Sequence, residues 1–252
     1  VEVRGAEAVP LAEGLTDGSY RYPEARLPAH VREYRFRHGR RWLGPEGLAD
    51  APSGWFRIDP GPLFTTPAWV PRSVFYQVFP ERFANGDPSN DPPDAEPWGA
   101  APELFNHFGG DLEGITRHLG RLQDLGVGAL CLSPIFTAPS NHKYDTGDYL
   151  QVDPAFGDEA ALRRLVDGAH ARGIRVILDG VFNHSGTDLF AFRDLEERGE
   201  ASPYRDWYFV KSFPVVREPE PSYEDWWGFS SLPKLNTANP EVRRYLLDVA
   251  TR

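Results

Sequence analysis

The chain has 252 residues, a length that fits one large domain or two small ones. Hydrophobic residues make up 40% and charged residues 25%, which is enough apolar material for a sizeable core and excludes a disordered chain. No run approaches the roughly 20 apolar residues that cross a bilayer. Cys131 is the single cysteine, so we expect neither a membrane span nor an internal disulfide. The chain lacks methionine and begins at Val1, from which we expect a missing N-terminal segment; the absence of a signal peptide is then uninformative.

Charge is unevenly distributed along the chain. Up to Arg72 there are 10 basic and 9 acidic residues, whereas the remainder has 17 basic and 28 acidic ones. Such an acidic surface repels phosphate backbones and argues against a nucleic-acid partner. One basic cluster stands apart, and the sequence favours a solvated hairpin around Gly39 over a binding patch. The cluster consists of Arg32, Arg35, Arg37, Arg40 and Arg41.

The first 70 residues are predicted to be rich in β-strands. Short alternating runs at 31–38 and 55–58 are separated by glycine and proline. From Val74 the pattern changes to strand, loop and helix. Residues 74–79 form a mostly apolar run, and a polar, proline-rich loop follows at 81–107. The helix after it ends at Gly126 and has apolar residues at helical spacing, namely Leu112, Ile115, Leu119, Leu122 and Leu125.

This cycle then repeats. Residues 127–132 and 174–178 are predicted as buried strands. Asp158 can cap the helix between them, whose inner face is Leu162, Leu165, Val166 and Ala169. Such alternation predicts an α/β fold with parallel strands covered on both faces. A last helix begins with Asn239 as its cap and Pro240 in its first turn, and its inner face is Val242, Tyr245, Leu246 and Val249.

Oxygen-bearing side chains crowd the loop after the first strand. Residues 85–91 read NGDPSND, and GGD follows at 109–111. Calcium takes carboxylate, amide and backbone oxygens, so this loop is a candidate metal site. It is not an EF-hand, because Asn90 occupies the position of the sharp-turn glycine. The alternative is a turn-rich loop in which Asp111 merely caps the next helix.

The loops after the second and third strands carry HKYDTGD at 142–148 and DGVFNH at 179–184. In parallel α/β sheets, ligands gather at the carboxyl ends of the strands. A tyrosine ring offers an apolar face to a sugar, and carboxylates can grip its hydroxyls. Taken separately, an ordinary polar loop and a plain hydrogen-bonded His184 remain the alternatives.

Together these motifs resemble the α-amylase superfamily, glycoside hydrolase family 13. Within this superfamily, the motifs are most similar to those of the neopullulanases, cyclomaltodextrinases and maltogenic amylases. Residues 74–91 (VFYQVFPERFANGDPSND) are similar to that group's first barrel strand and calcium loop, HKYDTGD to its second loop, and DGVFNH to the family motif DxVxNH. LPKLN at 232–236 resembles the group's MPKLN, with Leu232 replacing methionine; α-amylases and oligo-1,6-glucosidases typically carry QPDLN.

The resemblance covers about Arg32 to the end and implies a fold of four parts. Residues 1–70 would be the C-terminal part of an N-terminal β-sandwich domain of the starch-binding type. Residues 71–184 would be the first three βα units of a (β/α)8 TIM barrel, and 185–235 the inserted B domain, a flap over the cleft. Residues 236–252 would return to a barrel helix.

The resemblance also implies roles for single residues. A structural calcium would be held by Asn85, Asp87, Asn90, Asp91, Gly109 and Asp111. Tyr144 would stack on the sugar before the scissile bond and His184 would hydrogen-bond it, with Asp145 and Asn183 as further substrate contacts and Asp179 as a buried orienter. Five aromatic residues of the flap would either face glucan or form the flap's own core: Trp207, Tyr208, Trp226, Trp227 and Phe229.

A retaining glycosidase needs two carboxylates flanking the bond. In the family the nucleophile is an Asp after the fourth barrel strand and the acid a Glu after the fifth, which would lie beyond Arg252. We therefore expect the parent protein to hydrolyse α-1,4 bonds in cyclodextrins, pullulan, starch or maltooligosaccharides, and this chain to be inactive alone. Three of eight barrel units would also leave strand edges and apolar faces exposed.

Two other functions remain open on the sequence. One is a non-catalytic glucan-binding module, and the other a superfamily member with transglycosylase or α-1,6 activity. An unrelated open sheet would require four ordered motifs to arise by chance. The group's habits suggest a homodimer for the intact parent and, with one cysteine, a cytoplasmic location.

Overall fold

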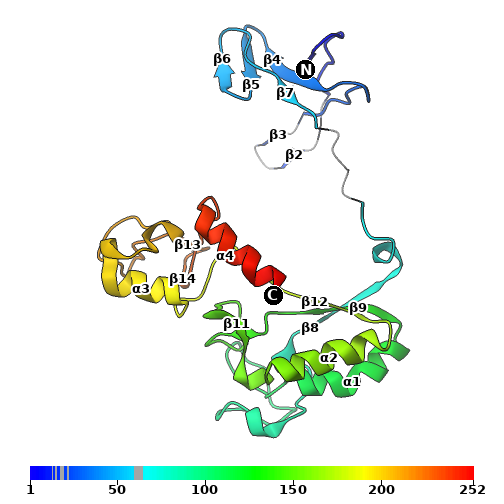
Figure 1. Ribbon diagram of the computed structural model, residues 1–252, viewed down its shortest axis with the longest axis vertical. Helices are drawn as coiled ribbons and strands as arrows, with labels where there is room; N and C mark the ends of the chain where they lie inside the picture. The colour runs from blue at the N-terminus through cyan, green and yellow to red at the C-terminus, as the bar shows by residue number, and fades with distance from the viewer. Residues whose placement is uncertain (13, 15, 18–19, 22, 60–64) are drawn as a thin grey trace. The chain divides into compact units, whose positions relative to one another are not determined.

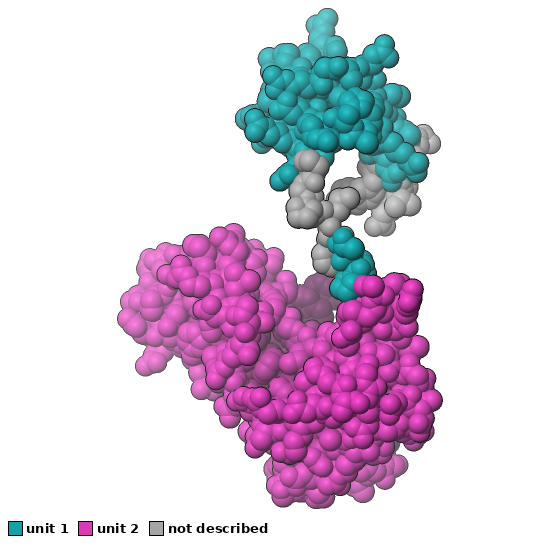
Figure 2. Space-filling view, turned by 45° about the vertical axis from the view of Figure 1, so that its right-hand side comes forward, with its two compact units in different colours: residues 1–67 teal, residues 68–252 magenta. Residues whose placement is uncertain are grey.

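The computed structural model describes residues 1–12, 14, 16–17, 20–21, 23–59 and 65–252 (Figure 1). The chain divides into two compact units, residues 1–67 and 68–252 (Figure 2). This division lies three residues before the boundary expected at 70, and the identity of the expected first domain, part of which falls outside the described residues, stays a prediction. None of the described helices is both long and apolar enough to cross a bilayer.

The first unit is an antiparallel sheet, as the alternating pattern predicts. Its strands are β1 (Glu2–Val3), β4 (Glu33–His38), β5 (Arg41–Gly44), β6 (Gly47–Ala49) and β7 (Phe56–Arg57), while β2 (Thr16–Asp17) and β3 (Tyr20–Arg21) form a separate pair. The turn between β4 and β5 is at Gly39, whose φ of 60° favours glycine. The predicted hairpin is confirmed, and four of its five arginines are exposed. Arg35 instead pairs with Glu2 at 2.7 Å and lies over the Trp55 ring.

The second unit contains a parallel sheet in the order β12-β9-β8. Its strands β8 (Val74–Val78), β9 (Val127–Leu132) and β12 (Arg175–Leu178) alternate with helices α1 (Leu112–Asp124) and α2 (Glu159–His170). The α/β prediction and its element order are confirmed. Asp158 caps α2 as predicted, accepting from Ala161 N at 2.7 Å. Leu125, predicted on the inner face of α1, is 61% exposed because it is the C-cap, beyond the last helical turn.

The helices cover one face of this sheet. Helices α1 and α2 lie side by side on it (Figure 1), and their Ile115 and Leu165 bury Leu130 of the central strand. The opposite face carries Phe75 and Ile177, which are 45% and 37% exposed. The expectation from the apolar strand pattern that both faces are covered is therefore wrong for the described residues. The exposed apolar face, and strands β8 and β12 with one neighbour each, agree instead with the open strand edges and faces expected of three barrel units.

The remaining elements of the second unit lie outside this sheet, and α3 and α4 contribute to a second apolar core. These elements are β10 (Phe136–Thr137), β11 (Asp148–Val152), α3 (Phe190–Arg198), β13 (Asp225–Trp226), β14 (Phe229–Pro233) and α4 (Pro240–Thr251), with short 3-10 turns η1 (Val70–Arg72), η2 (Pro80–Arg82), η3 (Pro88–Asn90), η4 (Pro154–Phe156), η5 (Gly199–Ala201) and η6 (Arg205–Trp207). Phe192 of α3 and Leu246 of α4 belong to one apolar cluster with Tyr149. Asn239 caps α4, as the sequence predicts.

Candidate functional site

The loops after β9 and β12 meet through a hydrogen bond between two predicted site residues. The Tyr144 hydroxyl donates to Asp179 Oδ2 at 2.9 Å. Asp179 directly follows β12, and its N–H donates to Leu132 O, so the strand ends fix its position. Burial and the neighbouring carboxylate raise the pKa of Tyr144, which keeps its hydroxyl a donor. The hydrogen bond to Tyr144 is compatible with the expected orienting role of Asp179, which stays a prediction, but its side chain is half-buried and not buried as expected.

Asp145 is buried within its own loop. Its carboxylate accepts from the Ser140 hydroxyl, which also lies 3.0 Å from His142 Nδ1. The Tyr144 N–H donates to the same His142 nitrogen at 3.1 Å. Burial lowers the pKa of His142. The structure therefore places Asp145 as a support inside the loop and adds His142, to which the sequence reasoning gave no role although it begins the HKYDTGD motif.

His184 is buried, with 5% of its surface exposed. Its Nδ1 lies 3.2 Å from Nδ2 of the exposed Asn183, whereas its Nε2 has no hydrogen-bond partner among the described residues. Burial lowers the pKa of His184, so the ring is neutral near pH 7. A buried polar atom without a partner is rare in proteins, which makes His184 Nε2 a candidate contact for a ligand or a water molecule.

An exposed aromatic stack lies beside His184. It consists of Trp226, Trp227 and Phe229, and the Trp226 ring centroid is 5.6 Å from that of His184. The ring centroids of Trp226 and Trp227 are 5.1 Å apart and their planes are inclined by only 4°. The Phe229 ring lies 6.0 Å from that of Trp226. Trp227 is 85% exposed. Trp207 and Tyr208, in contrast, are buried in the second core, which is one of the two roles considered for the flap aromatics, and glucan contact by the three exposed ones stays a prediction.

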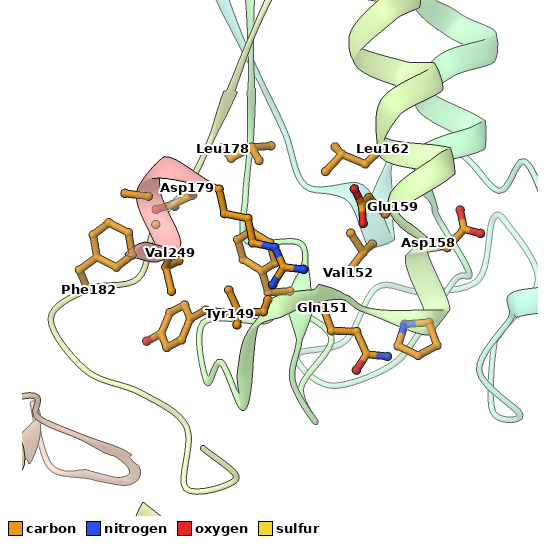
Figure 3. Close-up of a pocket in the computed structure, with 17 residues that line it drawn as sticks. Tyr149, Gln151, Val152, Asp158, Glu159, Leu162, Leu178, Asp179, Phe182 and Val249 are labelled. Carbon is orange, nitrogen blue, oxygen red and sulfur yellow. The ribbon is translucent and has the colours of Figure 1, made fainter. Parts of the chain in front are cut away.

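Asp179 also lines a hollow of about 740 Å³ (Figure 3). Its walls are the end of β12, helix α2, strand β11 and helix α4, represented by Leu178, Leu162, Val152 and Val249. Tyr144, Asp145, Asn183 and His184 do not line it. The hollow is mainly apolar and adjoins the edge of β12 that has no neighbour among the described strands.

The oxygen-rich loop brings three of its predicted ligands together. Asn85 Nδ2 donates to Asp91 Oδ1 at 2.6 Å, and a side chain at Gly109 would collide with both. The Oδ1 atoms of Asn85 and Asn90 are buried and lack a hydrogen-bond partner among the described residues. Unpaired amide oxygens beside a carboxylate are a donor set that fits calcium.

Asp87 and Asp111 use their oxygens elsewhere. Asp87 Oδ1 accepts from the N–H and hydroxyl of Ser89. The fully buried Asp111 carboxylate accepts from the N–H groups of Gly86, Asp87 and Gly114 and caps α1. The capping role, considered from the sequence as the alternative, is present, and metal binding by these two residues stays a prediction. No three His, Cys, Asp or Glu side chains gather as a metal site in the described part of the chain.

Comparison with known proteins gives one consistent family. The α-amylase catalytic domain matches residues 77–252. The chain is 55% identical over 191 residues to Neopullulanase 2 of Thermoactinomyces vulgaris, an alignment covering 75% of this chain and 33% of that protein. It is 44% identical over 261 aligned residues to a cyclomaltodextrinase of Geobacillus thermopakistaniensis, covering 97% and 44%.

Among solved structures, the cyclic α-maltosyl-(1→6)-maltose hydrolase from Arthrobacter globiformis superimposes with a TM-score of 0.73 at 48% identity, covering 75% of this chain and 42% of that one. The chain thus spans less than half the length of these relatives. The resemblance inferred from the four motifs is confirmed. The protein belongs to the α-amylase family, glycoside hydrolase family 13.

Proposed function

We propose that this chain belongs to a retaining α-glucan hydrolase that cleaves α-1,4 bonds in cyclodextrins, pullulan, starch or maltooligosaccharides. In this proposal the 252 residues supply the first three βα units, the B domain and glucan contacts. The observation that carries it is the neutral, buried His184, whose unpaired Nε2 lies beside an exposed aromatic stack. Apolar ring faces next to a hydrogen-bonding atom suit a sugar, which has C–H faces and hydroxyls.

The residues would divide the work of binding. Tyr144 would present its ring to the sugar while Asp179 holds its hydroxyl at 2.9 Å. His184 would hydrogen-bond a sugar hydroxyl without carrying charge. Trp227 and its stacked neighbours would support the next glucose units. Hydrolysis requires two carboxylates flanking the bond, which family resemblance assigns to segments after a fourth and a fifth strand, so the proposal assigns hydrolysis to a longer protein.

Incubation of the 252-residue chain with β-cyclodextrin tests the catalytic part. We expect no reducing sugar above a no-protein control, while a cyclomaltodextrinase assayed in parallel gives the positive signal. Release of reducing sugar by the purified chain would show that the carboxylates needed are already present and would overturn this part.

Calorimetric titration with maltoheptaose tests the binding part. We expect saturable heat from the chain and a loss of affinity in His184→Ala and Trp227→Ala. Leu125→Ala is the matched control, because it truncates a side chain of 61% exposure at the end of α1 remote from these loops. Absence of saturable heat, or equal effects in all three variants, contradicts glucan binding at this site.

We also propose a structural calcium at Asn85, Asn90, Asp91 and Gly109. When bound, the ion would neutralise the carboxylate and satisfy the two unpaired amide oxygens. Calcium should raise the thermal unfolding midpoint of the chelator-treated chain, magnesium should do so less, and Asn90→Ala should reduce the calcium effect. An identical midpoint with chelator and with excess calcium contradicts the proposal.

For the intact parent protein we also propose a homodimer and a cytoplasmic location. Light scattering tests the first of these.

A further inference from the structure

A buried ion pair joins the HKYDTGD loop to the residue that follows β11. The side chains of Lys143 and Asp153 are each 7% exposed, and Lys143 Nζ is 2.7 Å from Asp153 Oδ2. The ammonium also donates to Ala138 O at 3.0 Å and lies over the Phe156 ring. Asp153 in turn accepts from the N–H groups of Ala138 and Ala155. Both charges are thus hydrogen-bonded to backbone groups that directly follow β10 or lie in η4.

The position of Lys143 in the chain is unusual as well. Its φ is 60°, in the left-handed region that a residue with a side chain adopts only at a cost. It separates His142 from Tyr144, whose rings lie 5.9 Å apart while the Tyr144 N–H donates to His142 Nδ1. The buried ion pair of Lys143 is therefore formed at the same residue whose backbone conformation brings His142 and Tyr144 together.

We propose that the Lys143–Asp153 pair is a positioning device that sets the orientation of Tyr144 and His142 for glucan binding, a role that rests on the function proposed above. Buried ion pairs contribute little net stability, because desolvation of the two charges offsets their attraction. A gain in stability is therefore a poor explanation for this pair. A better explanation is that the pair fixes one arrangement of the HKYDTGD loop, since any other arrangement leaves a buried charge unpaired.

Two variants break the pair from opposite sides. Asp153→Asn removes the negative charge with little change of shape. Lys143→Gly removes the ammonium, while glycine adopts a φ of 60° without strain. Each should weaken maltoheptaose binding by about tenfold, the equivalent of one well-placed hydrogen bond. The exposed Lys211 serves as the matched control, and Lys211→Met should leave affinity unchanged. Unchanged affinity in both pair variants with a lower unfolding midpoint would identify a stabilising ion pair only and overturn the proposal.

The pKa of His142, read from its NMR titration, is a second and independent measurement. Burial and the Lys143 charge lower this pKa, and Asp145 raises it. Loss of the Asp153 charge alone would lower the His142 pKa or leave it unchanged. Release of the loop would expose the ring and raise the pKa toward 6.5. Of the two explanations, only release of the loop therefore predicts a rise of the His142 pKa in Asp153→Asn.

A rise in the pKa together with weaker binding supports the proposal. A fall or no change overturns it, and so does a rise with unchanged affinity. The titration needs no glucan. If the wild-type chain binds none, the proposed function fails, and the sign of the His142 shift still decides whether the pair positions the loop.

Discussion

Replacement of Asp111 by alanine should disconnect helix α1 from the loop that precedes it. The carboxylate caps the helix through Gly114 N at 2.6 Å and also binds the N–H groups of Gly86 and Asp87, 24 to 25 residues earlier. Loss of a cap costs about 1 kcal/mol. The buried Gly86 N–H would also lose its acceptor, at about 1–3 kcal/mol. We therefore expect the free energy of unfolding to fall by roughly 2–4 kcal/mol.

Asp158 provides the matched control for this variant. It caps α2 through Ala161 N at 2.7 Å, in the same geometry, but holds no distant loop. Asp158→Ala should cost only about 1 kcal/mol. Urea unfolding followed by tryptophan fluorescence, with chelator present throughout, measures both. Equal losses would show that Asp111 acts as a cap alone and would refute the assignment of loop anchoring to it.

Three further outcomes are expected. Gly114→Ala should destabilise α1, because the new methyl group would collide with Ala84 O. In the same helix, the methyl group of Gly120→Ala would meet no other atom, so this variant should be more stable by about 0.5–1 kcal/mol. Denaturant titration measures both. Trp227→Ala should leave the unfolding midpoint within experimental error and weaken glucan binding, whereas Trp207→Ala should cost about 3–5 kcal/mol of stability. Because burial lowers the pKa of His184 below its unfolded value of 6.5, the free energy of unfolding should fall as pH drops from 6.5 toward the folded pKa. His184→Gln should lose this pH dependence, and an equally steep dependence in the variant and the wild type contradicts the prediction.

The order of elements was predictable because two different periodicities alternate along the chain. Apolar runs at 127–132 and 174–178 indicate strands, and leucines at helical spacing with aspartate caps indicate α1 and α2. Only the first of these strands is buried as expected, because β12 lies at an open edge of the sheet. What covers the sheet was not predictable in the same way. Strand residues such as Ile177 alternate between the two faces, and their apolar character does not reveal whether a neighbouring element lies over each face.

The site shows the same division. The motifs identify Tyr144, Asp179 and His184, but the sequence leaves open which aromatics are exposed. That choice depends on the β13–β14 turn, where Trp227 adopts a φ of 55°, a conformation that a tryptophan does not signal. The inward direction of Lys143 was equally hidden, because a lysine between polar residues in a loop is usually solvated.

Hydrogen-bond capacity separates structural from functional polar groups in this chain. Buried carboxylates with fully used oxygens tie the loops in place: Asp111 holds residues 86–87, Asp153 holds the second loop, and Glu81 accepts from the N–H groups of Phe108 and Gly109. The buried polar atoms left without partners in the described part of unit 2 are His184 Nε2 and the Oδ1 atoms of Asn85 and Asn90. These unpaired atoms lie at the proposed sugar and calcium sites. The anchoring carboxylates hold these loops in one shape before a ligand binds. A ligand that pairs with the three unpaired atoms then gains affinity, because the cost of burying those atoms and ordering the loops is already met by folding.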